Sequence, residues 1–386
     1  MNTQIASRAA SAGIWLSAVL VVGLTGCRFA GAGPTTPTPK AEVPLTEIVG
    51  AALAADGSGW VLDASHHLFV TVDGGDTWRS LAPPIEPEAV AASGDYMLVA
   101  SLVVLQADDM PKGYEVAIAV SEDRGSTWTT TNVPVQGQPG ALRVALDGAA
   151  AAILVQQTTS SNFSLADILV SKDGHDWSSK LAPIAGKVAI TAPDEMWIAG
   201  GTTGGELFRS ADFGSSWEPV LLPVPSDAQY GVDTPRATGP TRREAVVTIN
   251  GDSSLVLVIA SEDSGISWDQ IRNVSIAAST GPGVTIPAAF VGGDWRIVTP
   301  DGAAIKMLGD VPSSEATRGL LGGVSDLSMA AGGLGWAAVD ASSCPTKSDC
   351  ESQHVLMRTL DGGTTWARLG QEASADPDGT NVPNAT

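Results

Sequence analysis

The sequence predicts an all-β protein built from repeated units, and three observations support this prediction. After residue 27, short apolar or alternating runs recur between turn residues, and no segment shows the 3.6-residue apolar period of an amphipathic helix. The 386 residues include 43 glycines and 24 prolines, as expected for a chain with many turns. A motif of aspartate, glycine and tryptophan recurs at a nearly constant spacing, which indicates a repeat architecture.

Composition and charge exclude two classes of protein. The chain contains 21 Lys and Arg against 42 Asp and Glu, so its formal net charge is −21. The electrostatic field of such a chain repels the phosphates of nucleic acids and the surfaces of anionic lipids, so a nucleic-acid-binding protein is excluded. Hydrophobic residues make up 44% of the chain, which is enough material for a core and excludes global disorder.

Residues 1–26 are predicted to be a lipoprotein signal peptide. Arg8 lies in a short polar start, and a mostly apolar run of 16 residues follows from Ala9 to Leu24. A membrane-spanning helix needs about 20 residues, so a stable transmembrane anchor is disfavoured. Leu24-Thr25-Gly26-Cys27 resembles the lipobox of bacterial lipoproteins, which implies cleavage before Cys27 and a diacylglycerol on its thiol. The alternative is a plain secretory signal followed by an unmodified cysteine.

Two polar segments flank the predicted folded domain, residues 46–370. Residues 27–45 combine the lipidated Cys27 with a Gly-, Pro- and Thr-rich run, which is expected to form a semi-extended tether. Residues 371–386 are polar and are expected to be disordered. Lipid and tether together predict a location on the extracytoplasmic face of a bacterial cell membrane.

The two remaining cysteines, Cys344 and Cys350, are predicted to form a disulfide. Outside the cytoplasm, a pair at this spacing is most simply a bridge that closes a small loop. A redox motif or a zinc site is disfavoured, because the spacing differs and the four histidines are scattered. The sequence therefore predicts neither a metal nor another cofactor.

The repeat motif has six copies, and their aspartates define the spacing of the units. The aspartates at positions 73, 123, 173, 212, 263 and 361 are separated by 50, 50, 39, 51 and 98 residues. The last interval equals two periods, so one degenerate unit is predicted between Asp263 and Asp361. A unit of about 48 residues with about four short strands matches one blade of a β-propeller. We therefore predict a seven-bladed β-propeller with four-stranded antiparallel blades.

Each copy of the motif is interpreted as a turn followed by a packing wedge. The aspartate carboxylate accepts hydrogen bonds from nearby backbone amides, and glycine supplies a positive φ that tightens the reversal. The tryptophan opens the next strand and is buried between adjacent sheets. The residues predicted to have these structural roles are Asp73, Trp78, Asp123, Trp128, Asp173, Trp177, Asp212, Trp217, Asp263, Trp268, Asp361 and Trp366.

The six copies resemble the Asp-box, or BNR, repeats of sialidases, sortilin-type receptors and the propeller assembly factors of photosystem II. Pairs such as Gly59-Trp60 ahead of the box are most similar to the last group. If the strands of a blade run A to D from the axis outward, the boxes lie on C-to-D turns, on the same rim as the A-to-B turns. The B-to-C and D-to-A loops then lie on the opposite rim.

We predict that this opposite rim, called here the long-loop rim, is the binding face. The longest insertions are assigned to B-to-C loops at Gln106–Gly113, Thr158–Ser164 and Ser342–Gln353, and to a D-to-A connection at Pro223–Thr241. Binding groups concentrate on loops that a rigid scaffold holds in place. The candidate binding residues are Tyr114, Tyr230, Arg236 and Arg243. The alternative for each of them is an ordinary solvated loop position.

A sialidase-like enzyme is the second hypothesis. The resemblance implies that such an enzyme needs three converging arginines, a tyrosine activated by a glutamate and an aspartate acid, and glycosidases generally use a carboxylate pair. The chain has only three tyrosines and no Arg-Ile-Pro motif before the first box, and no pattern selects among Arg143, Arg236, Arg243 and Arg296. No catalytic residue is predicted. The leading hypothesis is a monomeric, non-enzymatic propeller that binds a protein or a cell-envelope polymer such as a glycan; the alternative is a sialidase-like or other glycoside hydrolase.

Overall fold

A computed structural model of the protein describes residues 47–107, 110–158, 165–300, 303–307, 312–321, 323–346 and 349–369. The predicted signal peptide, Cys27, the tether and the tail beyond residue 370 lie outside these residues. The side chains of Cys344 and Cys350 also lie outside the described part, so their disulfide stays a prediction. No helix in the described ranges has the length and apolar character needed to span a membrane.

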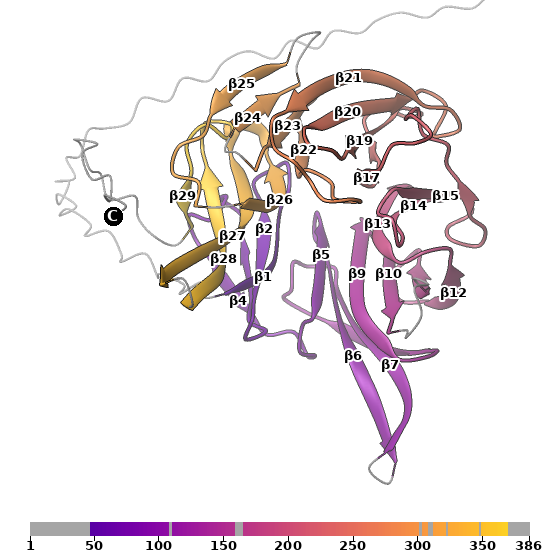
Figure 1. Cartoon of the computed structure of the whole chain (residues 1–386). Helices are drawn as coiled ribbons and strands as arrows, with labels where there is room; N and C mark the ends of the chain where they lie inside the picture. Colours follow the sequence, from indigo (N-terminus) through magenta and orange to yellow (C-terminus); the bar gives the residue numbers. More distant parts are fainter. Residues whose placement is uncertain are drawn as a thin grey trace, which may run out of the picture. The chain divides into compact units, whose positions relative to one another are not determined.

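Seven antiparallel sheets follow one another along the chain (Figure 1). Blade 1 consists of β1 (Ile48–Leu53), β2 (Gly59–Asp63), β3 (Leu68–Thr71) and β4 (Arg79–Leu81). Blade 2 consists of β5 (Ala89–Ser93), β6 (Tyr96–Ala107), β7 (Met110–Ser121) and β8 (Thr129–Val135). Blade 3 consists of β9 (Pro139–Asp147), β10 (Ala150–Gln157), β11 (Ala166–Ser171) and β12 (Ser178–Ala182). Blades 4 and 5 consist of β13 (Gly186–Ala192), β14 (Glu195–Gly200), β15 (Glu206–Ser210) and β16 (Glu218–Pro219); and β17 (Tyr230–Val232), β18 (Arg236–Ala237), β19 (Arg243–Ile249), β20 (Ser254–Ser261) and β21 (Asp269–Ile276). Blades 6 and 7 consist of β22 (Ala288–Val291), β23 (Asp294–Val298), β24 (Ala303–Lys306) and β25 (Ser313–Ala316); and β26 (Gly323–Met329), β27 (Gly335–Thr346), β28 (Asp349–Thr359) and β29 (Ala367–Arg368).

The predicted seven-bladed propeller is confirmed. Each sheet has four antiparallel strands in chain order, except that the sheet of blade 5 includes the additional short strand β18 beside β19. Blade 6 is the degenerate unit expected between Asp263 and Asp361, and its strands have only four or five residues. Among the described residues, the only helical element is one 3-10 turn at Ala331–Gly333.

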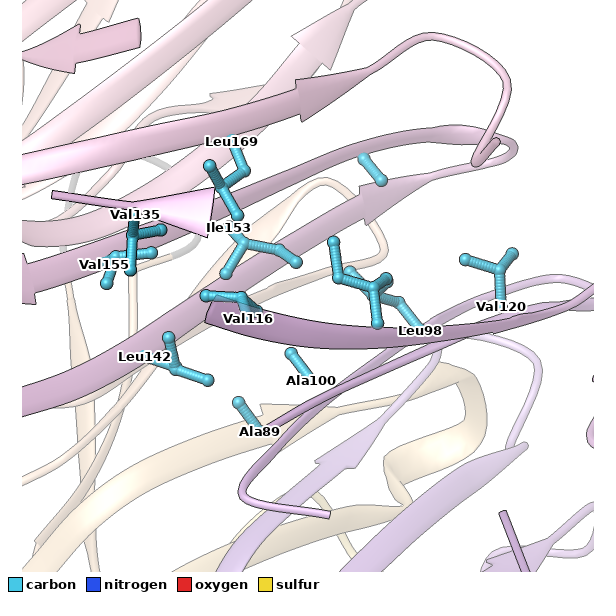
Figure 2. Close-up of a cluster of buried hydrophobic side chains, with 12 residues drawn as sticks. Ala89, Leu98, Ala100, Val116, Val120, Val135, Leu142, Ile153, Val155 and Leu169 are labelled. Carbon is cyan, nitrogen blue, oxygen red and sulfur yellow. The ribbon is translucent and has the colours of Figure 1, made fainter. Parts of the chain in front are cut away.

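Seven clusters of buried apolar side chains lie between the blades, one for each pair of neighbours. Figure 2 shows the cluster between blades 2 and 3, where Leu98 and Val116 pack against Ile153 and Leu169. Successive side chains of a strand point to opposite faces of its sheet, and both faces are apolar because a neighbouring blade covers each of them. The apolar runs noted in the sequence are therefore the inter-blade core.

The ring closes through side-chain packing between the last and first blades. Trp336 and Leu356 of blade 7 belong to the same buried cluster as Ile48 and Val61 of blade 1. Each of these two blades is built from strands that are contiguous in the sequence, so no strand is exchanged between them. The seventh interface is therefore of the same kind as the other six.

The Asp boxes lie on the same rim as the A-to-B turns, which we call the box rim. In blade 1, the amide of Gly74 in the box donates to the carbonyl of Gly57 at 2.8 Å, and in blade 2 the amide of Arg124 donates to the carbonyl of Asp95 at 2.8 Å. The amide of Gly362 in blade 7 bonds in the same way to Gly333. The long β6–β7 hairpin of blade 2 leaves the ring from the opposite, long-loop rim (Figure 1).

One predicted connection needs correction. The segment Pro223–Thr241 is not a single D-to-A loop, because β17 and β18 within it form the innermost strand of blade 5 and pair with β19. Pro235 lies between these two strands and cannot donate a backbone hydrogen bond, which explains why the strand is interrupted. Residues 238–242 are therefore an A-to-B turn on the box rim.

Candidate functional site

The box aspartates are held inside their own turns. Asp73 accepts hydrogen bonds from the amide of Thr77 at 2.8 Å and from the hydroxyls of Thr77 at 2.6 Å and Thr71 at 2.7 Å. The same pattern recurs at Asp123, Asp212, Asp263 and Asp361, while Asp173 in the shorter copy accepts from two turn amides. These hydrogen bonds to the ionised carboxylate lower the pKa of Asp123, Asp173 and Asp212 to about 2.

The box tryptophans are buried to different degrees. Trp268 and Trp366 are almost fully buried, whereas Trp78, Trp128, Trp177 and Trp217 are half-buried. The indole of Trp268 packs edge-on against Trp197 of the preceding blade, with ring centroids 5.9 Å apart. The predicted burial of the box tryptophans is therefore nearly complete in blades 5 and 7 and partial in blades 1 to 4.

Exposed large apolar side chains are more numerous on the long-loop rim than on the box rim. The described residues of this kind on the long-loop rim are Val104, Leu105, Leu165, Leu181, Leu221 and Val284. Those in the box turns are Val72, Ile266 and Leu360. Leu221 follows β16 and is 91% exposed. The six side chains on the long-loop rim come from blades 2 to 5.

Two long hairpins extend the same rim. β6 and β27 each have 12 residues, and their partners β7 and β28 have 12 and 11. Their register runs past the ends of the other strands of their blades, to Ala107 opposite Met110 and to Thr346 opposite Asp349. These hairpins belong to blades 2 and 7, so they stand on either side of blade 1.

A hollow of about 460 Å³ opens on this rim between blades 4 and 5. Thr202, Thr203 and Glu206 line one side of it, and Tyr230 and Pro282 line the other. Tyr230 is half-buried, and this burial, together with the nearby Glu206 carboxylate, raises the pKa of its phenol. The hydroxyl of Tyr230 therefore stays protonated at neutral pH and available as a hydrogen-bond donor.

Charged side chains from three blades approach one another around the ring axis. We call Lys187, Asp233, Arg236 and Asp326 the axial charge cluster. Lys187 of β13 forms an ion pair with Asp233, which follows β17, at 3.0 Å. Asp326 of β26 keeps contact with water but is partly desolvated by the protein atoms around it, which we call its crowding. This desolvation is the main cause that raises the pKa of Asp326; the negative charge of Asp233 also raises it, and the positive charges of Lys187 and Arg236 lower it.

The structure separates the four predicted binding residues. Tyr114 lies in β7, half-buried at the base of the long hairpin and opposite Val104, and Tyr230 lines the hollow on the same rim. Arg236 is exposed on β18, in a second hollow of about 390 Å³ between the innermost strands. The prediction that Arg236 and Arg243 lie on the long-loop rim is therefore wrong, because both lie toward the A-to-B turn of blade 5.

Arg243 is buried and fully engaged. Its side chain is 2% exposed and forms an ion pair with Glu195 of blade 4. Its guanidinium also donates to the carbonyls of Gly239 at 3.1 Å and Arg242 at 2.9 Å. Arg243 therefore joins two blades, and a ligand in solvent does not reach it.

Sequence reasoning missed Lys187, Asp233 and Asp326. These residues lie in three different blades, and only ring formation brings them together. For Lys187 and Asp326 the signal is a charged residue within an innermost strand that otherwise consists of small, apolar or hydroxyl residues, as in Gly-Lys-Val-Ala-Ile-Thr-Ala of β13.

The arginines weighed for a sialidase-like site do not converge. Arg143 and Arg236 lie exposed on innermost strands, but Arg243 and Arg296 lie on second strands. Arg296 faces the buried Asp294, with its Nε 3.5 Å from the carboxylate, and Arg243 faces Glu195. Within the described residues, no group of three His, Cys, Asp or Glu side chains is arranged to hold a metal ion.

Comparisons with known proteins agree on the fold. No protein-family model and no curated protein matches the chain. Solved structures similar to it include RRP9 WD40 repeats (10% identity, TM-score 0.51, covering 82% of this chain and 94% of that one). A structure described as YCF48 bound to D1 peptide is 16% identical with a TM-score of 0.41, covering 85% of this chain and 82% of that one. Trypanosoma rangeli sialidase is 14% identical with a TM-score of 0.39, covering 75% of this chain and 57% of its own. The likeness to RRP9 shows the propeller fold alone.

Proposed function

We propose that this chain is a lipid-anchored propeller on the outer face of a bacterial cell membrane that binds a protein or cell-envelope polymer through its long-loop rim, without catalysing a reaction. The observation that supports this most directly is the presence of two long hairpins on that rim, together with more exposed apolar side chains than on the box rim. A rigid ring with projecting hairpins provides the preorganised loops that binding requires.

The chemistry of the rim favours a large partner with both apolar and hydrogen-bonding groups. Leu221, Val284 and Val104 offer apolar contact points spread over several blades, and Tyr230 offers a neutral phenol in a hollow. Such a distribution suits contacts made over an extended surface better than it suits a single small ligand. The separated arginines and the fully bonded box carboxylates support the non-enzymatic part of the proposal.

Photo-crosslinking in intact cells tests the choice of rim. A photoreactive benzoylphenylalanine is placed in the full-length chain at Leu221 on the long-loop rim or at Leu360 on the box rim; the two side chains are 91% and 65% exposed. We expect a discrete cross-linked adduct from position 221 and none from position 360. Adducts from position 360 alone, or from neither position, would contradict the proposal.

A second measurement tests the absence of catalysis. The full-length protein in detergent is incubated with sialosides and with a panel of chromogenic glycosides. We expect no release of sugar or chromophore above a boiled control. Turnover that is lost in Arg236→Ala would instead identify the innermost strands as an active site.

A further inference from the structure

We propose that the box rim holds a separate small-molecule site between blades 1 and 2 that takes an apolar or aromatic carboxylate. A cavity of about 350 Å³ opens there, on the opposite rim from the proposed binding face. Its walls come from the strands and box turn of blade 1, and from β5, the start of β6 and the box turn of blade 2. This volume is in the range of ligand pockets, at roughly 300–1,000 Å³.

The interior of the cavity is apolar. Trp60 lines it and packs on the apolar cluster between blades 1 and 2, and Trp78 lines it from the box turn while its indole packs against Trp336 of blade 7. Leu53 and Met97 also line it and are 7% and 3% exposed, and Met97 belongs to the same cluster as Trp60. Aromatic and aliphatic walls of this kind favour a ligand whose body is itself apolar or aromatic.

Two arginines lie at the edge of this apolar space. Arg79 follows the box tryptophan of blade 1 and is exposed, and among the described residues its guanidinium contacts only the carbonyl of Arg124. Arg124 pairs with Asp95 on the outer side. In a chain with net charge −21, a guanidinium without a carboxylate partner beside an apolar cavity is complementary to an anion.

Both arginines are specific to this pair of blades. The residue after the box tryptophan is Arg79 in blade 1, whereas the other five boxes are followed by Thr129, Ser178, Glu218, Asp269 and Ala367. Arg124 occupies the position after the box aspartate with φ of 57°; glycine stands there in blades 1, 3 and 7, and Phe213 and Ser264 adopt the same left-handed conformation in blades 4 and 5. Arg124 is therefore the only charged residue at this position among the six boxes.

Calorimetric titration of the full-length protein with 3-phenylpropionate tests the site, and uncharged 3-phenylpropionamide serves as the matched ligand. We expect the acid to bind about tenfold more tightly than the amide, because only the acid accepts charge-assisted hydrogen bonds from Arg79. Arg79→Gln should reduce this preference to less than about twofold, and Arg79→Lys should retain part of it. Ala92→Trp, which places an indole into the cavity from an exposed position on β5, should abolish binding of both ligands.

Lys180→Gln is the control variant. Lys180 reaches the carbonyl of Phe213 in the box of blade 4, as Arg79 reaches that of Arg124, but it does not line this cavity. Its replacement should leave both titrations unchanged. Equal binding of acid and amide, no heat with either ligand, or an equal effect of Lys180→Gln and Arg79→Gln would overturn the proposal. Thermal melts of every variant confirm that the ring is intact, and partner binding by the long-loop rim does not enter this test.

Discussion

The indole nitrogen of Trp336 in the last blade donates a hydrogen bond to the carbonyl of Gly74 in the first blade at 3.2 Å. The same ring packs against Trp78, with centroids 5.6 Å apart. Gly74 has a φ of 71°, and a Cβ there would lie 2.6 Å from the end of the Leu334 side chain, so a larger residue would require that side chain to move. This contact joins the two ends of the ring.

Replacing Trp336 should weaken the ring more than replacing its counterpart in blade 1. Trp336→Ala removes a 2% exposed indole and its hydrogen bond, and we expect the free energy of unfolding to fall by about 3–5 kcal/mol. Trp60→Ala, at a half-buried position, is the control and should cost less. Urea denaturation measures both, and equal losses would contradict the role of Trp336 in closure.

The box carboxylates should make the protein sensitive to acid. The pKa of Asp123 is about 2 in the folded protein, against about 3.9 in an unfolded chain. Its stabilising contribution is therefore complete above the unfolded pKa and is lost as the pH falls from about 4 to about 2. We expect Asp123→Asn to have a lower Tm than the wild type at pH 6, with the difference shrinking at pH 2.5.

The matched control for Asp123→Asn is Asp252→Asn. Asp252 is exposed on a turn between β19 and β20, and its carboxylate makes no hydrogen bond among the described residues. Its replacement should leave the melting profile nearly unchanged across this pH range. A pH-independent difference between wild type and Asp123→Asn, measured by circular dichroism, would mean that the turn does not depend on the ionised carboxylate.

Arg243→Ala should lower the free energy of unfolding. The substitution removes one partner of a buried ion pair and leaves Glu195 without its main cation, which typically costs about 3–5 kcal/mol. Arg236→Ala removes an exposed side chain seven residues earlier and should change the free energy of unfolding by less than about 0.5 kcal/mol. Chemical denaturation of the two variants compares them directly, and similar stabilities would contradict the buried role of Arg243.

Much of the fold could be predicted because the residues that form each Asp-box turn lie next to one another in the sequence. Asp73 and Thr77 are four residues apart and bond to each other, so the motif can be recognised in the sequence, and its spacing gives the number of blades. The axial charge cluster was not predictable, because Lys187 and Asp326 approach each other only when the ring closes. The burial of Arg243 was hidden for a similar reason, since its partner Glu195 belongs to another blade.

Asp326→Asn should stabilise the protein at neutral pH. The raised pKa of Asp326 means that its ionised form is less favourable in the folded ring than in the unfolded chain. Relative to neutral pH, the folded state is favoured below the unfolded pKa of about 3.9, and this advantage is lost as the pH rises through the folded pKa. We therefore expect a higher Tm for Asp326→Asn at pH 7.5 and no difference near pH 3.

Asp233→Asn provides the contrast for Asp326. It removes the partner of Lys187 from the same cluster, so the Tm at pH 7.5 should stay the same or fall. If both variants raise the Tm equally, the effect reflects the net negative charge of the chain and not the crowding of Asp326. Differential scanning calorimetry at the two pH values separates these outcomes.

The membrane anchor proposed for the N-terminal segment rests on Cys27. Cys27→Ala should prevent lipid attachment, so the protein should move from the membrane pellet to the soluble fraction and lose incorporation of labelled palmitate. Cys344→Ala, which also removes one cysteine, should remain in the pellet. Retention of Cys27→Ala in the pellet would contradict a lipid anchor at this position.

The closed ring also predicts where the chain can be opened and its ends rejoined without loss of the fold. Every blade is one uninterrupted stretch of sequence, and the junction between Ile48 and Trp336 is held by the same kind of apolar contact as the other six. Among the described residues no strand crosses this junction, so new termini placed in an inter-blade loop, with the old ends linked, should yield a circular permutant with the same seven sheets.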